Sequence, residues 1–188
     1  MNGCRQRGFS LLELLVTLFV IVLVTSLVTL NVGSGDADLE LQNAMEGLAN
    51  TGNYALDEAQ FTGTDHGLLL SLEMSDEGPV YRYRWLERGP SFWQAPESGK
   101  EVFSEGQLPP GLELELILDE VIQEEASFIE LPERPAPQIT LYASGETAPG
   151  SLTLISSESG DVLWRLDWNL LGNFQARRGY ELEEGELL

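Results

Sequence analysis

The feature that most constrains this chain is a long apolar run close to its amino terminus. Residues 14–30 carry no charge, and 13 of these 17 side chains are Leu, Val, Ile or Phe. If residues 9–32 form one helix with a rise of about 1.5 Å per residue, that helix measures about 36 Å and can cross a hydrocarbon core of roughly 30 Å. The sequence therefore predicts a transmembrane helix over residues 9–32.

The charges on the two sides of this run predict its orientation. Arg5 and Arg7 precede it, Asp36 and Asp38 follow it, and no small-residue cleavage site comes after it. Basic residues favour the cytoplasmic side of a membrane, and a secretory signal peptide would end in such a cleavage site. We expect a single-pass protein with a cytoplasmic amino terminus and an exported carboxyl-terminal part.

Glu13 places a carboxylate inside the apolar segment. A carboxylate at a helix centre costs about 3 kcal/mol on insertion scales, whereas the apolar side chains together contribute roughly 5 kcal/mol, so the segment still inserts. Two interpretations remain open. Either Glu13 reaches the lipid headgroups from its place one turn into the helix, or a cation neutralises it inside the membrane.

The residues around Glu13 form a recognisable pattern. A short basic leader ends in Gly8, Phe9 follows, Glu13 is the fifth residue from that junction, and the apolar run comes next. This arrangement resembles the type IV prepilin signal. The resemblance implies that residues 1–8 are a leader peptide, that a prepilin peptidase cuts between Gly8 and Phe9, and that the new Phe9 amine is methylated. Cys4 would leave with the leader.

The same resemblance implies a role for Glu13 in assembly. In that family the carboxylate meets the Phe9 amine of a neighbouring subunit when subunits join a helical filament. An ammonium removes most of the cost of a lone carboxylate in hydrocarbon, and the pair forms in only one axial register. Glu13 would therefore set the register of the filament. The resemblance also implies an inner-membrane anchor and a periplasmic domain.

A second helical stretch is predicted beyond Gly33 and Gly35. These glycines each cost about 1 kcal/mol in a helix relative to alanine, so we expect a bend or a melted turn there. Apolar or small residues then recur at spacings of three and four, which indicates a helix with one buried face. They are Leu41, Ala44, Met45, Leu48, Gly52, Ala55, Leu56 and Ala59. We expect residues 33–62 to form a stem that packs on a sheet.

The remainder of the chain reads as an antiparallel β domain over residues 63–180, followed by an acidic tail over residues 181–188. Short apolar runs alternate with Gly, Pro and acidic turns, which is typical of such sheets. The predicted strands are 67–73, 80–87, 112–119, 127–131, 138–143, 151–156, 162–167 and 171–177. The predicted fold class is α+β, with a long amino-terminal helix packed on an antiparallel sheet or sandwich, as in type IV pilins.

Two later segments extend the resemblance. Residues 108–112 read LPPGL and residues 144–149 read SGETAP. They are similar to the LPxG and SGEx(T/S)P patterns of the H-type minor pseudopilins and FimT-like minor pilins. Gly150 departs from the pattern because an aromatic residue is expected after the proline, which puts the packing of that turn in doubt.

Charge decides between the two branches of this family. Residues 33–188 hold 30 acidic and eight basic side chains, and Arg177 and Arg178 are their only basic doublet. Nucleic-acid binding needs clustered cations to displace phosphate counterions, so no nucleic-acid partner is expected. This favours a minor pseudopilin of type II secretion, near the tip of the pseudopilus, that helps export folded proteins. The alternative is a FimT-like or FimU-like minor pilin in pilus assembly, adhesion or DNA uptake.

No enzyme is predicted. The single histidine, His66, lies between glycine-containing turns and reads as a surface residue, and no nucleophile motif occurs. A calcium site remains open at the acids Asp119, Glu120, Glu124 and Glu125, but they lack EF-hand spacing and favour a solvated face. We expect no cofactor and no metal. The implied partners are a prepilin peptidase, the major pseudopilin, other minor pseudopilins and the inner membrane.

Overall fold

The computed structural model describes residues 11–75, 78–96, 100–129 and 132–179, and it describes residues 24–36 as helix backbone without side chains. Contacts within the chain form two compact units, Met1–Leu39 and Glu40–Leu188. The first unit is helical throughout its described residues. The second unit contains the rest of the same helix and two antiparallel sheets.

Helix α1, Leu11–Thr62, begins with a strongly apolar and exposed surface. Its large hydrophobic side chains between Leu11 and Leu23 are 48–79% exposed. Among the described side chains, no helix is long and apolar enough to cross a membrane. Residues 9 and 10, and the side chains of residues 24–32, belong to the span predicted from the sequence and lie outside the described part.

Gly33 and Gly35 lie within α1, so the melted turn predicted there is wrong. Two glycines in a helix cost about 2 kcal/mol. Once turns exist on both sides, each further residue adds a hydrogen bond without a new nucleation cost. The helical flanks therefore outweigh the local preference of the glycines.

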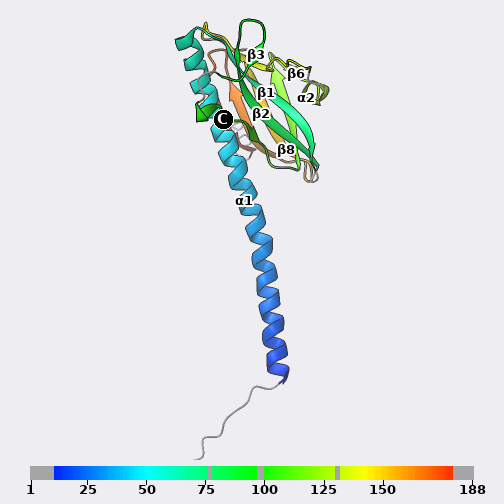
Figure 1. The fold of residues 1–188 in the computed structure, drawn as a ribbon. Coiled ribbons are helices and arrows are strands. Elements are labelled where there is room, and N and C mark those ends of the chain that lie inside the picture. The colour runs from blue at the N-terminus through cyan, green and yellow to red at the C-terminus, as the bar shows by residue number, and fades with distance from the viewer. Residues whose placement is uncertain (1–10, 76–77, 97–99, 130–131, 180–188) are drawn as a thin grey trace, which may run out of the picture. The chain divides into compact units, whose positions relative to one another are not determined.

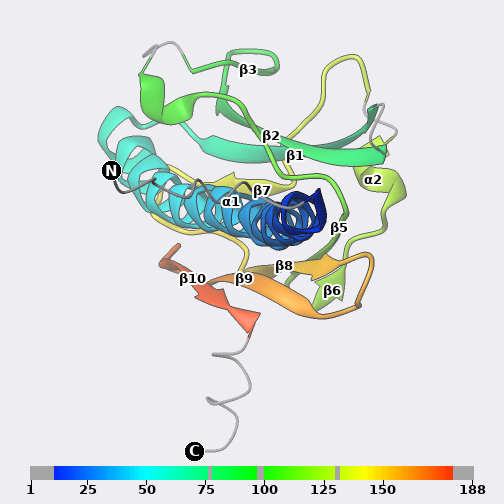
Figure 2. The ribbon, with the colours of Figure 1, turned by 90° about the horizontal axis from the view of Figure 1, so that it is seen from below.

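The predicted helical stripe is confirmed in the second unit. Met45, Ala55 and Ala59 have no exposed surface, and Leu41, Leu48 and Leu56 are at most 5% exposed. All of these residues except Ala59 join one core with side chains from both sheets. Figure 2 shows this part of α1 lying between the two sheets.

Each sheet has five strands and all strand pairs are antiparallel. The first sheet comprises β1 (His66–Ser75), β2 (Gly78–Arg88), β3 (Trp93–Gln94), β4 (Gly106–Gln107) and β7 (Ile139–Leu141). Its strand order is β3-β2-β1-β7, and β4 also pairs with β2. The second has the order β10-β9-β8-β5-β6, and it comprises β5 (Leu112–Leu118), β6 (Val121–Ile122), β8 (Gly150–Ser156), β9 (Val162–Trp168) and β10 (Phe174–Arg178). The predicted α+β class with antiparallel sheets is therefore confirmed (Figure 1).

One predicted strand is wrong. Residues 127–131 were expected to be extended, but Ala126–Ile129 forms the short helix α2. Ser127 ends a tight turn, since its hydroxyl and its backbone N–H both bond to the Glu124 carbonyl. Phe128 then points into the core, where it is 1% exposed and lies edge-on to Tyr81. A single buried aromatic residue, rather than an alternating face, anchors this segment.

Candidate functional site

The beginning of α1 carries the residues singled out by the prepilin pattern. Glu13 lies in the first turn of the helix, and its backbone carbonyl accepts a hydrogen bond from the Thr17 hydroxyl at 2.6 Å. Gly8 and Phe9 lie outside the described residues. The helical backbone thus displays Glu13 on a surface that is otherwise formed by exposed Leu, Val, Ile and Phe side chains.

This surface has no core of its own to join within the first unit. Leu11, Leu12 and Leu14 are 79%, 73% and 60% exposed. Apolar surface in water costs about 25 cal/mol per Å², and contiguous exposed patches of this kind mark membrane or protein contacts. The described first part of α1 therefore presents contiguous apolar surface of the kind that marks an interaction site.

In the second unit, polar side chains fix α1 to the sheets. Asn53 accepts a hydrogen bond from the Phe174 backbone N–H (2.9 Å) and donates one to the Phe174 carbonyl (3.1 Å). A Cβ on Gly52 would lie 2.9 Å from the Phe174 ring, so the missing side chain lets β10 approach the helix. Arg178 reaches across to Gln42 with a 2.7 Å hydrogen bond.

Lys100, the only lysine in the chain, ties a loop to α1. Its ammonium donates to both Glu58 oxygens at 2.8 and 2.9 Å and to the Tyr54 hydroxyl, which itself donates to Glu58 at 2.9 Å. The Lys100 and Tyr54 hydrogen bonds hold the pKa of Glu58 below its usual value, and those with Glu58 and Tyr54 raise the pKa of Lys100. This cluster positions a loop and offers no reactive group.

The LPPGL segment is the crossing from the first sheet to the second. Leu108 is 1% exposed, and its N–H bonds to the Tyr81 carbonyl on β2. Gly111 then adopts a φ of +80°, which strongly favours glycine. Its carbonyl accepts bonds from the Ser157 N–H (3.0 Å) and hydroxyl (2.8 Å) beyond β8. The motif therefore has a folding role.

The SGETAP segment forms a second tight turn, and the packing beside it explains why position 150 is a glycine. Gly145 adopts a φ of +92°, and the Trp168 indole donates a 2.7 Å hydrogen bond to the Ala148 carbonyl. A Cβ on Gly150 would lie 2.2 Å from the Ile117 carbonyl and 2.8 Å from the Trp168 ring. Trp168 thus occupies the space beside this turn, and a larger residue at 150 does not fit.

The basic doublet is engaged with the chain itself. Arg177 pairs with Asp167 at 3.1 Å, and the Arg178 guanidinium lies 5.1 Å from the centre of the Trp164 ring. Neither side chain is presented as part of a continuous basic face. Asp167 also pairs with Arg165 at 2.8 Å, so two arginines share one carboxylate.

His66 is not at the surface, so that prediction is wrong. It is 2% exposed, its Nδ1 donates to the Thr64 carbonyl at 2.9 Å, and its ring lies 5.5 Å from that of Phe103. Phe103, at the end of the short 3₁₀ helix Glu101–Phe103, covers His66, which is the first residue of β1. A histidine held in this way is part of the core.

The acids named as a candidate calcium site lie in two different segments of the fold. Asp119 and Glu120 are the two central residues of the β5–β6 hairpin, with φ values of 48° and 66°, whereas Glu124 and Glu125 precede α2. Across the described residues, no group of three or more His, Cys, Asp or Glu side chains is arranged to hold a metal ion.

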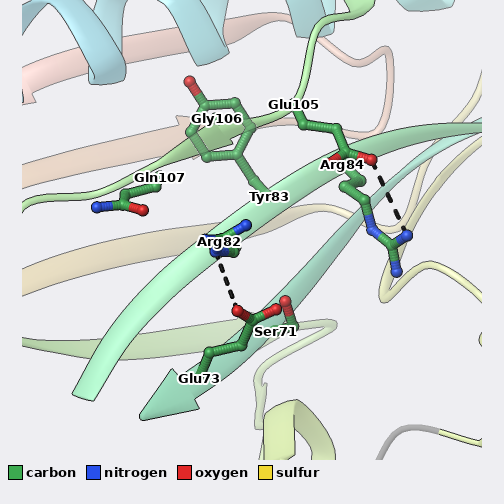
Figure 3. Close-up of a pocket in the computed structure, with 8 residues that line it drawn as sticks. All are labelled: Ser71, Glu73, Arg82, Tyr83, Arg84, Glu105, Gly106 and Gln107. Carbon is green, nitrogen blue, oxygen red and sulfur yellow. Dashed lines mark ion pairs between the residues drawn. The ribbon is translucent and has the colours of Figure 1, made fainter. Parts of the chain in front are cut away.

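A polar cleft of about 460 Å³ lies on the first sheet (Figure 3). Arg82 on β2 pairs with Glu73 on β1 at 3.1 Å, and Arg84 faces Glu105 at 4.0 Å. Among the described residues that line the cleft, the hydroxyl groups are those of Ser71 and Tyr83. These lining residues include no histidine or cysteine that could act as a base or nucleophile. The cleft can bind through charge and hydrogen bonds but lacks a catalytic pair.

Comparison with known proteins finds similarity in both parts of the chain. Residues 3–29 match the family described as the prokaryotic N-terminal methylation motif. The chain is 29% identical to the type II secretion system protein H of Aeromonas hydrophila over 166 residues, which cover 84% of this chain and 85% of that protein. It is also 29% identical to the protein of the same name from Pseudomonas aeruginosa, over 79% of this chain and 83% of that protein.

A solved structure shares the fold of this chain. The crystal structure of the minor pseudopilin EpsH from the type II secretion system of Vibrio cholerae is similar to this chain with a TM-score of 0.57. The match has 22% identity and covers 74% of this chain and 94% of EpsH. The resemblance to H-type minor pseudopilins that the sequence predicted is therefore confirmed.

Proposed function

We infer that this chain is an H-type minor pseudopilin of a type II secretion system, a structural subunit near the tip of the periplasmic pseudopilus that helps export folded proteins. One observation carries the inference: an N-terminal methylation motif and a two-sheet domain with the EpsH fold occur in the same chain. The relatives are structural subunits, so no enzymatic activity is proposed.

The processing steps follow from the motif. We propose that a prepilin peptidase removes residues 1–8 by cutting between Gly8 and Phe9 and that the Phe9 amine is then methylated. Residues 9–32 then anchor the chain in the inner membrane, residues 33–62 form a stem, and residues 63–180 form the periplasmic domain with an acidic tail at 181–188. The exposed apolar side chains of Leu11–Leu23 support the anchoring role.

Glu13 is proposed to set the axial register of the filament. Glu13 lies in the first turn of α1 among exposed apolar side chains, which we propose pack against the helices of neighbouring subunits. In hydrocarbon, an uncompensated carboxylate is costly and an ammonium of a neighbouring subunit offsets that cost. The cation that the prepilin resemblance implies is the Phe9 amine of the adjacent subunit.

The domain supports secretion over DNA uptake. All described cations of residues 33–188 are engaged within the chain, and acidic side chains outnumber them almost fourfold. A phosphate backbone would meet net repulsion. The partners proposed are therefore the prepilin peptidase, the major pseudopilin and the other minor pseudopilins, with no nucleic acid.

The test is deletion and complementation in the bacterium that makes the protein. We expect deletion to abolish the release of type II substrates into the medium and the full chain to restore it, while pilus-driven motility and DNA uptake stay unchanged. Lost motility or DNA uptake with intact secretion would instead assign the chain to a type IV pilus.

A further inference from the structure

The polar cleft on the first sheet has the size of a small-molecule site. Its volume of about 460 Å³ falls within the roughly 300–1,000 Å³ that such sites occupy. Its described lining consists of two arginines, two glutamates and one each of serine, tyrosine, glutamine and glycine, and so contains no aliphatic side chain. The core of a stable protein interface is apolar. The cleft therefore suits a small hydrophilic ligand better than a segment of another protein.

The charges of the cleft cancel, although the domain around it is strongly acidic. Residues 33–188 hold 30 acidic and eight basic side chains, whereas the cleft holds Arg82 and Arg84 with Glu73 and Glu105. A polyanion such as a phosphate chain would be repelled by the domain as a whole. A ligand with one positive and one negative group has no net charge and can pair with both kinds of side chain. The cleft therefore favours a zwitterion.

The two arginines keep donors available for a carboxylate. Arg82 pairs with Glu73 through Nε at 3.1 Å, which leaves its two terminal amino groups for a ligand. Arg84 Nη1 lies 4.0 Å from Glu105 Oε1, which is longer than a hydrogen bond. All four side chains are about half exposed, and ion pairs between exposed side chains add little to stability. The pairs can therefore rearrange around a carboxylate, which a guanidinium binds through two parallel N–H bonds.

The two glutamates approach the arginines from opposite sides of β2. A Cβ on Gly106 would collide with the Tyr83 ring, so the glycine lets β4 pair with β2 at this point. That pairing brings Glu105, the residue before β4, to Arg84. On the other side of β2, strand β1 supplies Glu73. The guanidinium groups thus lie between two carboxylates (Figure 3).

We propose that the polar cleft binds a zwitterionic amino-acid group, that is, an ammonium and a carboxylate on one carbon atom. The carboxylate pairs with Arg82 and Arg84, and the ammonium pairs with one of the two glutamates. The proposal rests on the function inferred above, which locates the domain in the periplasm. Two sources carry this group there: free amino acids, and the peptide stems of the cell wall in which a diamino acid keeps one free amino-acid end.

The first test compares three defined probes by isothermal titration calorimetry with the purified full chain in detergent. The zwitterionic probe is the tripeptide N-acetyl-L-alanyl-γ-D-glutamyl-meso-diaminopimelate. Two matched probes replace diaminopimelate, either by lysine, which lacks the side-chain carboxylate, or by 2-aminopimelate, which lacks the side-chain ammonium. We expect each matched probe to bind about tenfold more weakly or worse, because each loses a charge-assisted contact.

The second test assigns the contacts to residues. Arg82→Gln with Arg84→Gln should weaken the zwitterionic probe about tenfold or more. The control is Arg165→Gln with Arg177→Gln, which removes the same charge from two arginines of the second sheet that lie outside the cleft. This control should stay within about twofold. An unchanged circular dichroism spectrum establishes that both variants fold.

A further variant separates a lost contact from a damaged fold. Glu73→Gln with Glu105→Gln should weaken the zwitterionic probe about tenfold and leave the 2-aminopimelate probe within about twofold, because that probe has no side-chain ammonium to lose. A merely structural role of the glutamates would weaken both probes equally.

Co-sedimentation with isolated peptidoglycan sacculi distinguishes the two sources. Binding of the wild-type chain to sacculi, lost in Arg82→Gln with Arg84→Gln, assigns the ligand to the cell wall. Binding of free meso-diaminopimelate in calorimetry without co-sedimentation assigns it to a soluble amino acid. Either result supports the zwitterion site.

Three results would overturn the proposal: no binding of any probe, equal binding of the three tripeptides, or an equal loss in both arginine variants. These results are distinct from failure of the proposed function. If only the cleft proposal is wrong, the wild-type chain still restores secretion in the deletion strain. If only the proposed function is wrong, the chain binds the zwitterionic probe and does not restore secretion.

Discussion

Helix α1 meets two different environments along one sequence element. Between Leu11 and Leu23 its large apolar side chains are exposed, whereas from Leu41 to Ala59 its apolar stripe is buried by the chain's own sheets. Burial within the chain makes the second part a determinant of folding. The first part remains exposed, and under the proposed function it contributes to assembly and not to folding. The comparison separates substitutions that unfold the protein from those that leave it folded and unassembled.

The largest effect is expected at Glu13. Glu13→Ala should lower incorporation into the pseudopilus roughly a hundredfold, because breaking a buried charge pair costs about 3–5 kcal/mol, while membrane insertion and domain stability stay unchanged. Incorporation is measured by co-purification with sheared pseudopili. Glu46→Ala, at an exposed glutamate on the second part of α1, is the control and should have little effect. Equal incorporation of both variants would remove the register role.

Two leucines on either side of the unit boundary give a sharper test of stability. Leu41 is 4% exposed and Leu39 is 55% exposed. Leu41→Ala should lower the free energy of unfolding of the domain by about 2–4 kcal/mol, and Leu39→Ala should change it by less than about 0.5 kcal/mol. Urea denaturation of the full chain in detergent, followed by tryptophan fluorescence, measures both. Similar losses would mean that the core extends past the boundary.

Glycine substitutions test the same contrast between packed and open sites. Gly150→Ala should destabilise the domain by about 1–3 kcal/mol, because the new methyl group would lie 2.2 Å from the Ile117 carbonyl. Gly47→Ala should stabilise α1 by about 0.5–1 kcal/mol, because nothing lies within 4 Å of the added Cβ. Thermal unfolding of the two variants measures the difference. A neutral Gly150→Ala would contradict close packing against the Ile117 carbonyl at this turn.

The sequence predicted the elements whose patterns are long or fixed by glycine. The stripe from Leu41 to Ala59 repeats for five turns, so its period is unambiguous, and Gly111 marked a turn that its φ of +80° explains. The seven confirmed strands each fall within a few residues of their predicted bounds. The apolar start of α1 was also predictable, because an uncharged run can be recognised in the sequence without knowledge of tertiary contacts.

The errors occurred where a tertiary contact decides the local structure. Residues 127–129 lie in helix α2, where Phe128 inserts into the core, and His66 is buried because Phe103, 37 positions away, covers it. Strands β3, β4 and β6 have two residues each, which is too short for any period-two pattern.

The smallest effect is expected at Lys100. Its removal in Lys100→Met takes away the hydrogen bonds that lower the pKa of Glu58. A carboxyl with a lowered folded pKa stabilises the protein above its unfolded pKa, about 4.3, and loses that contribution as pH falls through the folded pKa. The variant should therefore melt a few degrees lower at pH 7 and show no difference near pH 3. A difference of equal size at both pH values would assign the loss to packing.

The proposed function requires that the first part of α1 belongs to a processed filament subunit. Intact mass and amino-terminal sequencing of the membrane-extracted protein, from cells with and without prepilin peptidase, measure this processing. We expect a chain that begins at N-methylated Phe9 when the peptidase is present and at Met1 when it is absent. A chain that begins at Met1 in both cells, or that is cut after Leu30, would contradict it.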